Sequence, residues 1–440
     1  MSAKFLLVKN KIKKFKKIIK VDGDKSISIR WLLLASQAIG VSKAKNLLKS
    51  EDVLNTIKCL KKLGVKVSIL NNNCAIEGRG INGFKYKKNI TLNAGNSGTA
   101  GRLILALLLK TPYKIKIIGD KSLSKRDFSR VIDPLEKIGA KFYPSGRKKL
   151  PISIIGSNYL RPITYYEKRA SAQCKTCVML ASLNTPGKMK IFAKRSRNHT
   201  ELMFNELNIP INVKSRKNID IINTSSPNRL NGFNLNIPGD ISSAAFFIAL
   251  TLLSKDSKLI LRNINLNPTR LGVLKILNKM GANIKVKNIK SRKGENCGDI
   301  IVKSKDKLKA INCPTSLNSS AIDEFLIIFL IAAKAKGIST FKNLDELNKK
   351  ESPRLKWGSK ILNKMGIKNI TTKNSIKIFG NPKLRINKKI IIKNYLKDHR
   401  VFMTSVIAAL SFGGIWKIHD SHAIRTSFPN FLKIINELKN

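Results

Sequence analysis

The chain has 440 residues, enough for two domains with sizeable cores, and its hydrophobic content of 42 % is typical of a folded protein. Its longest apolar runs, such as residues 325–333, are far shorter than the roughly 20 residues of a membrane-spanning helix, so no membrane partner is expected. Lysine and arginine number 85 against 26 acidic residues, a net charge of +59, but aromatic residues make up only 6 % and do not interleave with basic clusters, so nucleic-acid binding is not expected as the main role.

The chain opens on a basic segment. Residues 9–20 hold seven lysines between Ile12, Phe15, Ile18 and Ile19. The segment lacks arginine and a signal-type apolar core, so it predicts a first strand over residues 5–20 with a solvated basic face, rather than a targeting or membrane-surface helix. This strand is expected to belong with the carboxyl-terminal half.

Six segments share one local pattern, in which small polar residues with a charged anchor precede an apolar run. They are residues 22–30, 93–102, 168–175, 238–243, 321–324 and 397–400, and residues 103–109 behind the second of them predict a buried helix. Each segment predicts the start of a helix, and Ser or Asp N-caps explain any one of them alone. Six together predict helix N-termini gathered around an anionic ligand, with Arg102 adding a forked positive charge.

A second pattern recurs every 70–85 residues or so. Residues 60–64, 135–139, 277–281 and 362–366 each predict the last turn of a helix that ends at a glycine and leads into a strand. Residues 205–209 are a fifth copy without the glycine, and residues 431–438 are the helix of a sixth. Six α/β units divide into two domains of three: residues 22–238, and residues 1–21 with 239–440. A ligand is expected in the cleft between two such domains.

Cysteine and histidine give no clear metal site. Six scattered cysteines in a chain of this size indicate reduced thiols, hence a cytoplasmic protein. Cys174 and Cys177 are spaced like a redox or zinc pair, but they lie in a helical stretch without a second pair, so coincidence on one helix face is favoured. His419 and His422 have only Asp420 nearby, and metal binding there is the less favoured reading.

Ten ordered motifs make the chain resemble the enolpyruvyl transferase family, in its shikimate branch, over nearly its whole length. They are residues 23–30 (GDKSISIR), 95–99 (GNSGT), 119–126 (GDKSLSKR), 171–173 (SAQ), 198–201 (NHTE), 238–240 (PGD), 267–270 (NPTR), 350–354 (KESPR), 398–400 (DHR) and 426–429 (TSFP). The resemblance implies an α/β fold of two similar domains, each of three repeated units with sheets outside and helices inside, like an inside-out barrel. It also implies transfer of the enolpyruvyl group of phosphoenolpyruvate to the 5-hydroxyl of shikimate 3-phosphate, with release of phosphate.

The reaction of this family passes through a tetrahedral adduct and uses neither a metal nor an organic cofactor, and the resemblance implies a monomer acting on small anionic substrates. Carried over motif by motif, Lys25, Asp323 and Glu351 are the expected catalytic residues. Asp323 would accept the hydroxyl proton, Glu351 would take part in proton transfer at the methylene carbon, and Lys25 would donate a proton or stabilise charge. The expected shikimate 3-phosphate residues are Lys25, Ser26, Arg30, Ser171, Ala172, Gln173, Arg197, Asp323 and Lys350. The expected phosphoenolpyruvate residues are Lys25, Asn96, Gly98, Arg126, Gln173, Lys350, Arg354 and Arg400.

The chain departs from the family pattern at four positions. Ala172 stands where many members have a second serine, and Leu103 where some have proline. Pro353 replaces a common aspartate, and Thr426 replaces a lysine of some members. In the family, glyphosate occupies the phosphoenolpyruvate site, and the bare Cα of Gly98 is expected to leave room for it. A glycine that only permits a left-handed turn is the alternative.

Two other functions are considered. The sister enzyme that transfers enolpyruvyl to a UDP-amino sugar generally uses a loop cysteine, and residues 119–126 contain none. A basic nucleic-acid-binding protein that has lost catalysis would not need Lys25, Arg126, Asp323, Lys350, Glu351 and Arg400 together. The spread of lysine along the whole chain indicates charge on solvated faces, which can still attract small anionic substrates.

Overall fold

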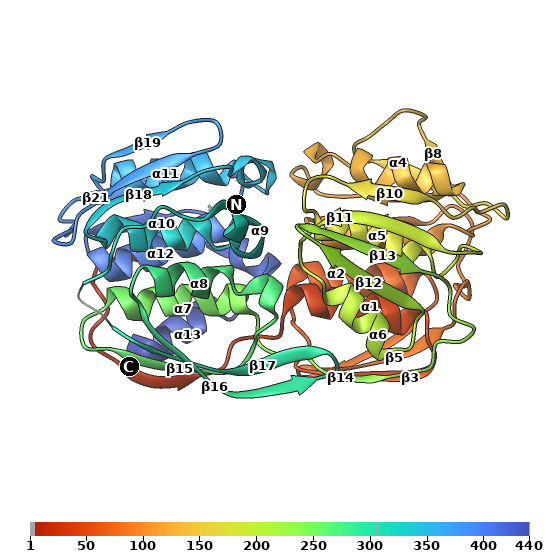
Figure 1. The fold of residues 1–440 in the computed structure, drawn as a ribbon, viewed down its shortest axis with the longest axis horizontal. Coiled ribbons are helices and arrows are strands. Elements are labelled where there is room, and N and C mark those ends of the chain that lie inside the picture. Colours follow the sequence, from red (N-terminus) through yellow and green to blue (C-terminus); the bar gives the residue numbers. More distant parts are fainter. Residues whose placement is uncertain (1–4, 305–306, 440) are drawn as a thin grey trace. The chain divides into compact units, whose positions relative to one another are not determined.

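The computed structural model describes residues 5–304 and 307–439 (Figure 1). Contacts within the chain divide it into two compact units. The amino-terminal unit consists of Gly23–Ile237 together with the short segment Ser291–Glu295. The carboxyl-terminal unit consists of the residues up to Asp22, Pro238–Lys290 and the chain from Asn296 onward.

The described residues of the amino-terminal unit form three four-stranded sheets, which share one topology. Their orders are β14-β3-β5-β4, β6-β7-β9-β8 and β10-β11-β13-β12. In each sheet the first pair of strands is parallel and the other two pairs are antiparallel. The strands are β3 (Ile39–Lys45), β4 (Lys66–Leu70), β5 (Asn73–Arg79), β6 (Thr91–Asn93), β7 (Ile115–Ile118), β8 (Lys141–Tyr143), β9 (Ile152–Ile155), β10 (Thr164–Glu167), β11 (Met189–Lys194), β12 (Ile211–Arg216), β13 (Ile219–Thr224) and β14 (Asn234–Asn236).

The carboxyl-terminal unit repeats this plan with three sheets among its described residues. Their orders are β16-β17-β15-β2, β18-β20-β19 and β1-β22-β21. The second sheet lacks a full parallel strand, but single parallel bridges from Lys309 and Asn312 to the β18 side take its place. The strands are β1 (Leu6–Val8), β2 (Lys16–Ile19), β15 (Lys258–Asn265), β16 (Asn283–Arg292), β17 (Glu295–Lys303), β18 (Gly337–Phe341), β19 (Asn369–Thr371), β20 (Ile376–Gly380), β21 (Lys389–Ile392) and β22 (Ile415–Ile418).

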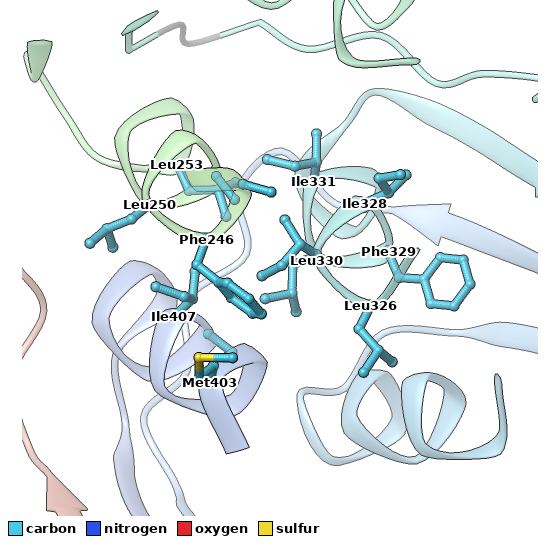
Figure 2. Close-up of a cluster of buried hydrophobic side chains, with 14 of the residues drawn as sticks. Phe246, Leu250, Leu253, Leu326, Ile328, Phe329, Leu330, Ile331, Met403 and Ile407 are labelled. Carbon is cyan, nitrogen blue, oxygen red and sulfur yellow. The ribbon is translucent and has the colours of Figure 1, made fainter. Parts of the chain in front are cut away.

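Two kinds of helix fill each unit. The first kind is largely buried on all sides, with mostly apolar side chains and a few buried polar or charged ones, as expected for a core helix. In the amino-terminal unit these are α1 (Lys25–Ser36), α3 (Gly98–Leu103) with the 3-10 helix η1 (Ile104–Leu108), and α5 (Ala172–Ala181). In the carboxyl-terminal unit they are α7 (Ile241–Leu253), α10 (Phe325–Lys334) and α12 (His399–Phe412), whose side chains interlock in Figure 2.

The second kind of helix leaves more of its surface to solvent. It comprises α2 (Glu51–Lys62), α4 (Ser129–Ile138), α6 (His199–Glu206), α8 (Gly272–Lys279), α11 (Arg354–Lys364) and α13 (Phe431–Lys439). Within each unit the strands lie outside the buried helices (Figure 1). This arrangement confirms the expected α/β fold with helices inside and sheets outside. Among the described residues, no helix has both the length and the apolar character needed to cross a membrane.

The helix ends follow the repeat read from the sequence. Gly64, Gly139, Gly281 and Gly366 all have positive φ one or two residues after the ends of α2, α4, α8 and α11, as the glycine pattern predicts. In the fifth copy, Asn208 takes the same left-handed conformation with φ of 54° after α6. Asparagine is the residue that most readily replaces glycine there, so the copy without a glycine keeps the same turn.

Two local expectations need correction. A single strand over residues 5–20 is wrong, because β1 pairs with β22 and β2 pairs with β15, in two different sheets of the carboxyl-terminal unit. The intervening chain crosses between these sheets and is anchored by the buried side chain of Phe15. The buried helix over residues 103–109 is instead the end of α3 followed by the tighter η1.

Candidate functional site

The six predicted helix starts open the buried helices, three on each unit. Side-chain oxygens cap five of them: Asp24, Ser97, Ser171, Asp240 and Asp398 accept hydrogen bonds from backbone N–H groups in the first turns of α1, α3, α5, α7 and α12. The sixth helix, α10, follows Glu324 without a side-chain cap. Capping therefore explains why Ser and Asp occur at these helix starts, but it does not explain the charged residues beside them.

In the amino-terminal unit, α1 supplies Lys25, Ser26 and Arg30 near its N-terminus. The Lys25 ammonium lies 3.1 Å from a carboxylate oxygen of Asp52 at the start of α2, and both side chains are largely buried. Arg30 is only 4 % exposed, and its guanidinium donates to the hydroxyl of Thr200 at 2.8 Å and to the backbone oxygen of Ser26 at 3.1 Å. The first turns of α1 therefore carry two largely buried cations, Lys25 and Arg30.

A second group of cations surrounds the start of α3. Arg126 donates to the amide oxygen of Asn96 at 2.9 Å, and the amide nitrogen of Asn96 donates to Asp120 at 2.6 Å. Gly98 lies directly beside this pair, because a Cβ built on it would fall 2.9 Å from the Arg126 guanidinium. Close approach of a cation explains this glycine, and its φ is not in the left-handed region.

Arg102 links α3 to α5. Its guanidinium donates to the side-chain oxygen of Gln173 at 2.6 Å and to the backbone oxygen of Asp127 at 2.9 Å, while Gln173 donates to Thr99 at 2.9 Å. Burial lowers the pKa of Arg102, and the charges of neighbouring arginines act in the same direction. A site that holds guanidinium groups this close gains when an anion enters it.

The other residues of this unit that are expected for shikimate 3-phosphate lie at the start of α5 and just before α6. Ser171, Ala172 and Gln173 form the first turn of α5, and all three are half-buried. The Ser171 hydroxyl caps that turn, and its backbone N–H donates to Glu167 at 2.9 Å. Arg197, also half-buried, immediately precedes α6.

The carboxyl-terminal unit brings together four expected residues from distant segments. Arg354 is 2 % exposed and donates to Asp323 at 3.2 Å and to Glu351 within hydrogen-bond distance. Lys350 lies 3.3 Å from the same Asp323 oxygen. Burial opposes the charge of Arg354, but the carboxylates of Asp398, Glu351 and Asp323 raise its pKa. The two expected catalytic carboxylates thus share one buried cation.

Asp398 is a buried carboxylate that binds several members of this cluster. It is fully buried, and its carboxylate accepts hydrogen bonds from Arg354 at 2.9 Å, from the backbone and hydroxyl of Ser352 at 3.2 and 2.9 Å, and from the backbone N–H of Arg400 at 2.9 Å. Burial by itself would favour the neutral acid, but the Arg354 guanidinium holds the pKa of Asp398 below its usual value. Asp398 therefore ties the loop of residues 350–354 to the first turn of α12.

Arg400 and Thr426 are two further residues of the carboxyl-terminal unit that lie in family motifs. The Arg400 guanidinium donates to the backbone oxygen of Asp323 at 2.8 Å and lies 3.8 Å from Glu324. Thr426, which stands where some family members have lysine, lies 3.3 Å from the ring of His399. The departure thus places a hydroxyl against a histidine at this position.

Sequence reasoning missed the groups that hold the expected residues in place. Asp52, Thr200 and Asp398 contact Lys25, Arg30 and Arg354. Thr200 and Asp398 lie within two of the ten motifs, but the motifs alone do not show which residues they contact. Among the described residues, no group of three His, Cys, Asp or Glu side chains that could hold a metal ion is found. All six cysteines are buried and free, including Cys174 and Cys177 on α5.

Known proteins match this chain over nearly its whole length, including all the site residues described above. The family model described as "EPSP synthase (3-phosphoshikimate 1-carboxyvinyltransferase)" matches residues 9–435. A 3-phosphoshikimate 1-carboxyvinyltransferase of Ruthia magnifica is 40 % identical over 422 residues, which is 96 % of this chain and 94 % of that protein. One from Bacillus cytotoxicus is 38 % identical over 417 residues, covering 94 % of this chain and 95 % of the relative.

Solved structures agree with the sequence relatives. An EPSP synthase from Acinetobacter baumannii superposes with a TM-score of 0.86 at 33 % identity, covering 99 % of this chain and 98 % of that one. The enolpyruvyl transferase NikO from Streptomyces tendae has a TM-score of 0.79 at 12 % identity over 99 % of this chain and 98 % of that one, a likeness of fold alone.

Proposed function

The chain belongs to the EPSP synthase (3-phosphoshikimate 1-carboxyvinyltransferase) family, and from that premise we propose how its side chains share the work of the reaction. The enzyme transfers the enolpyruvyl group of phosphoenolpyruvate to the 5-hydroxyl of shikimate 3-phosphate and releases phosphate, a step of aromatic amino-acid biosynthesis. The alternatives of a UDP-amino-sugar transferase and of a non-catalytic nucleic-acid-binding protein are not favoured. The residue roles below are our proposal.

We assign shikimate 3-phosphate chiefly to the amino-terminal unit. Lys25, Ser26 and Arg30 on α1 and the first turn of α5 together offer cations, hydroxyls and exposed N–H groups of the kind that bind phosphate and carboxylate. Ser171 would contact the phosphate, with Ala172 and Gln173 beside it and Arg197 at the start of α6. The pairing of Lys25 with Asp52 supports its place, because it keeps the ammonium near the helix start.

We assign phosphoenolpyruvate to the residues that the family motifs imply for it. Asn96, Gly98 and Arg126 supply one part, Lys350, Arg354 and Arg400 supply the other, and Lys25 and Gln173 touch both substrates. Arg126 beside the bare Cα of Gly98 supports the first part, because an anion can approach the guanidinium closely there. Arg354 is already bound by carboxylates, including Asp398. An anion can bind Lys350 and Arg400 without displacing those carboxylates from Arg354.

The observation that carries the catalytic assignment is the cluster of Asp323, Lys350, Glu351 and Arg354. We propose that the carboxylate of Asp323 accepts the 5-hydroxyl proton as the oxygen attacks C2 of phosphoenolpyruvate, while a proton is added to the methylene carbon. In the second step phosphate leaves and a proton is removed from the resulting methyl group, with Glu351 and Lys25 taking part in these transfers. Lys350 and Arg354, each bound to Asp323, hold the carboxylate in place.

We further propose that the enzyme acts as a monomer in the cytoplasm. The monomer is what the family resemblance implies, and six buried free thiols suit a reducing compartment. Phosphate release measured with both substrates, and with each alone, tests the function. Release is expected only with both substrates, and a folded protein that releases none contradicts the proposed function.

A further inference from the structure

Two threonine hydroxyls accept hydrogen bonds from the Arg30 guanidinium, and neither threonine is among the residues expected to bind a substrate or to take part in catalysis. The Nε of Arg30 donates to Thr200 Oγ1 at 2.8 Å, and its Nη2 donates to Thr176 Oγ1 at 3.2 Å. The two hydroxyls are themselves 2.8 Å apart. The two threonines lie on different helices, Thr176 on α5 and Thr200 on α6, and both are at most 1 % exposed. Three helices therefore meet at one guanidinium.

The geometry matches the fork of an arginine side chain. Nε and Nη2 lie on one edge of the planar guanidinium, and two adjacent oxygens on that edge fix both its position and its rotation. A third bond, from Nη1 to the backbone oxygen of Ser26 at 3.1 Å, closes the arrangement within α1. A long side chain ordered in this way before a ligand arrives loses little further conformational entropy on binding.

An ion pair next to the hydroxyls keeps their helices together. The ammonium of Lys175 lies 2.6 Å from a carboxylate oxygen of Glu201, and both side chains are almost completely buried. Lys175 precedes Thr176 on α5, and Glu201 follows Thr200 on α6. Because these contacts are adjacent in both helices, the ion pair and the hydroxyl pair act as two neighbouring links between α5 and α6.

We propose that Thr176 and Thr200 are positioning residues for substrate, which orient the Arg30 guanidinium to receive an anionic group of shikimate 3-phosphate. The inference rests on the proposed assignment of Arg30 to that substrate. It goes further by making the affinity for one substrate depend on two buried hydroxyls that do not touch it. It also separates Thr176 and Thr200 from other buried threonines such as Thr185, which follows α5 and whose hydroxyl donates to the backbone oxygen of Ala181.

The test replaces the hydroxyl without changing side-chain volume. In Thr200→Val, the guanidinium of Arg30 loses one of the two hydroxyls that orient it, and the KM for shikimate 3-phosphate is expected to rise about tenfold, roughly the effect of one hydrogen bond to a charged group. The KM for phosphoenolpyruvate and kcat are expected to change by less than about threefold. Thr200→Ser, which restores the hydroxyl, is expected to return the KM close to the wild-type value, and Thr176→Val should resemble Thr200→Val.

Thr185→Val is the matched control, a buried threonine beyond the other end of α5, and it is expected to leave the KM for shikimate 3-phosphate unchanged. An Arg30→Ala background gives an independent arm, measured as calorimetric binding of shikimate 3-phosphate. There Thr200→Val should have no further effect. An unchanged KM in Thr200→Val, failure of serine to rescue it, or an equal effect of Thr200→Val with and without Arg30 would overturn the inference. Absence of turnover in the wild type would instead count against the proposed function.

Discussion

Asp323 is the residue on which the proposed chemistry depends most directly. Its carboxylate contacts both Lys350 and Arg354. Asp323→Asn keeps the size and polarity of the side chain but cannot take up the hydroxyl proton, so turnover is expected to fall by about 100-fold or more. Shikimate 3-phosphate should still bind, because most of the groups proposed for it lie on the other unit. Steady-state rates and calorimetry measure the two effects, and near-normal turnover would remove Asp323 from the mechanism.

Gly98 tests the space next to Arg126. The structure removes the alternative that this glycine serves a left-handed turn, since its φ lies outside that region. In Gly98→Ala the new methyl group meets the guanidinium nitrogens of Arg126 at 2.9 Å and of Arg102 at 3.4 Å unless they shift. If glyphosate occupies the phosphoenolpyruvate site, as the family resemblance implies, the wild type is sensitive to it. The larger inhibitor should lose more affinity than the substrate.

We expect the glyphosate concentration for half-inhibition to rise about tenfold or more in Gly98→Ala, with the KM for phosphoenolpyruvate changing by less than about threefold. Parallel titrations of the two proteins measure both values. Equal losses for both ligands, or a wild type already indifferent to glyphosate, would contradict the argument from space.

At the scale of the element, Asn208 shows how a helix end survives a change of residue. Its φ of 54° is the left-handed conformation that glycine provides in four other copies of the repeat. Asn208→Ala is expected to lower the free energy of unfolding by about 1 kcal/mol, because a β-carbon without a local hydrogen-bonding group is strained there. Asn208→Gly should be nearly neutral. Urea unfolding measures both, with Asn212→Ala on the exposed surface of β12 as control.

Asp398 shows how an element boundary depends on charge. Asp398→Asn leaves the buried Arg354 with fewer counter-charges, and a loss of about 3 kcal/mol in the free energy of unfolding is expected at pH 7. The folded-state pKa of Asp398 lies below its ordinary value, so its stabilising contribution is present above the unfolded pKa of about 4 and lost as the pH falls through the folded pKa. The difference between the two proteins should therefore shrink below about pH 4, and a difference independent of pH would contradict this account.

At the scale of the whole molecule, the net charge of +59 sets how anionic substrates arrive. A strongly positive surface raises the rate of encounter with anions, and salt screens this attraction. We expect kcat/KM for both substrates to fall by about threefold or more between 50 and 300 mM potassium chloride, with kcat changing much less. Unfolding measured in the same salt series separates screening from loss of stability. A kcat/KM that does not depend on salt would show that the charge plays no part in substrate capture.

Much of the architecture was readable from the sequence, because its signals are local. Gly64, Gly139, Gly281 and Gly366 end their helices through a backbone preference that needs no distant partner. Long apolar runs such as residues 244–250 of α7 and 325–333 of α10 identify core helices for the same reason, since a helix without a polar face has to be buried. The split of residues 5–20 into β1 and β2 was not readable, because strand pairing depends on partners near residues 258 and 416.

The family, the repeated α/β unit and the charged residues expected in the site could all be predicted from the sequence, because each depends on residue types at short spacing. Which groups bind those charged residues became visible only once the helices had been packed together. Arg354 meets Asp323 and Asp398, and Arg30 meets Thr176 and Thr200, across separations of 31 to 170 residues. A buried charge requires partners with a defined geometry, and the packing of helices that are distant in the chain determines which side chains can supply them.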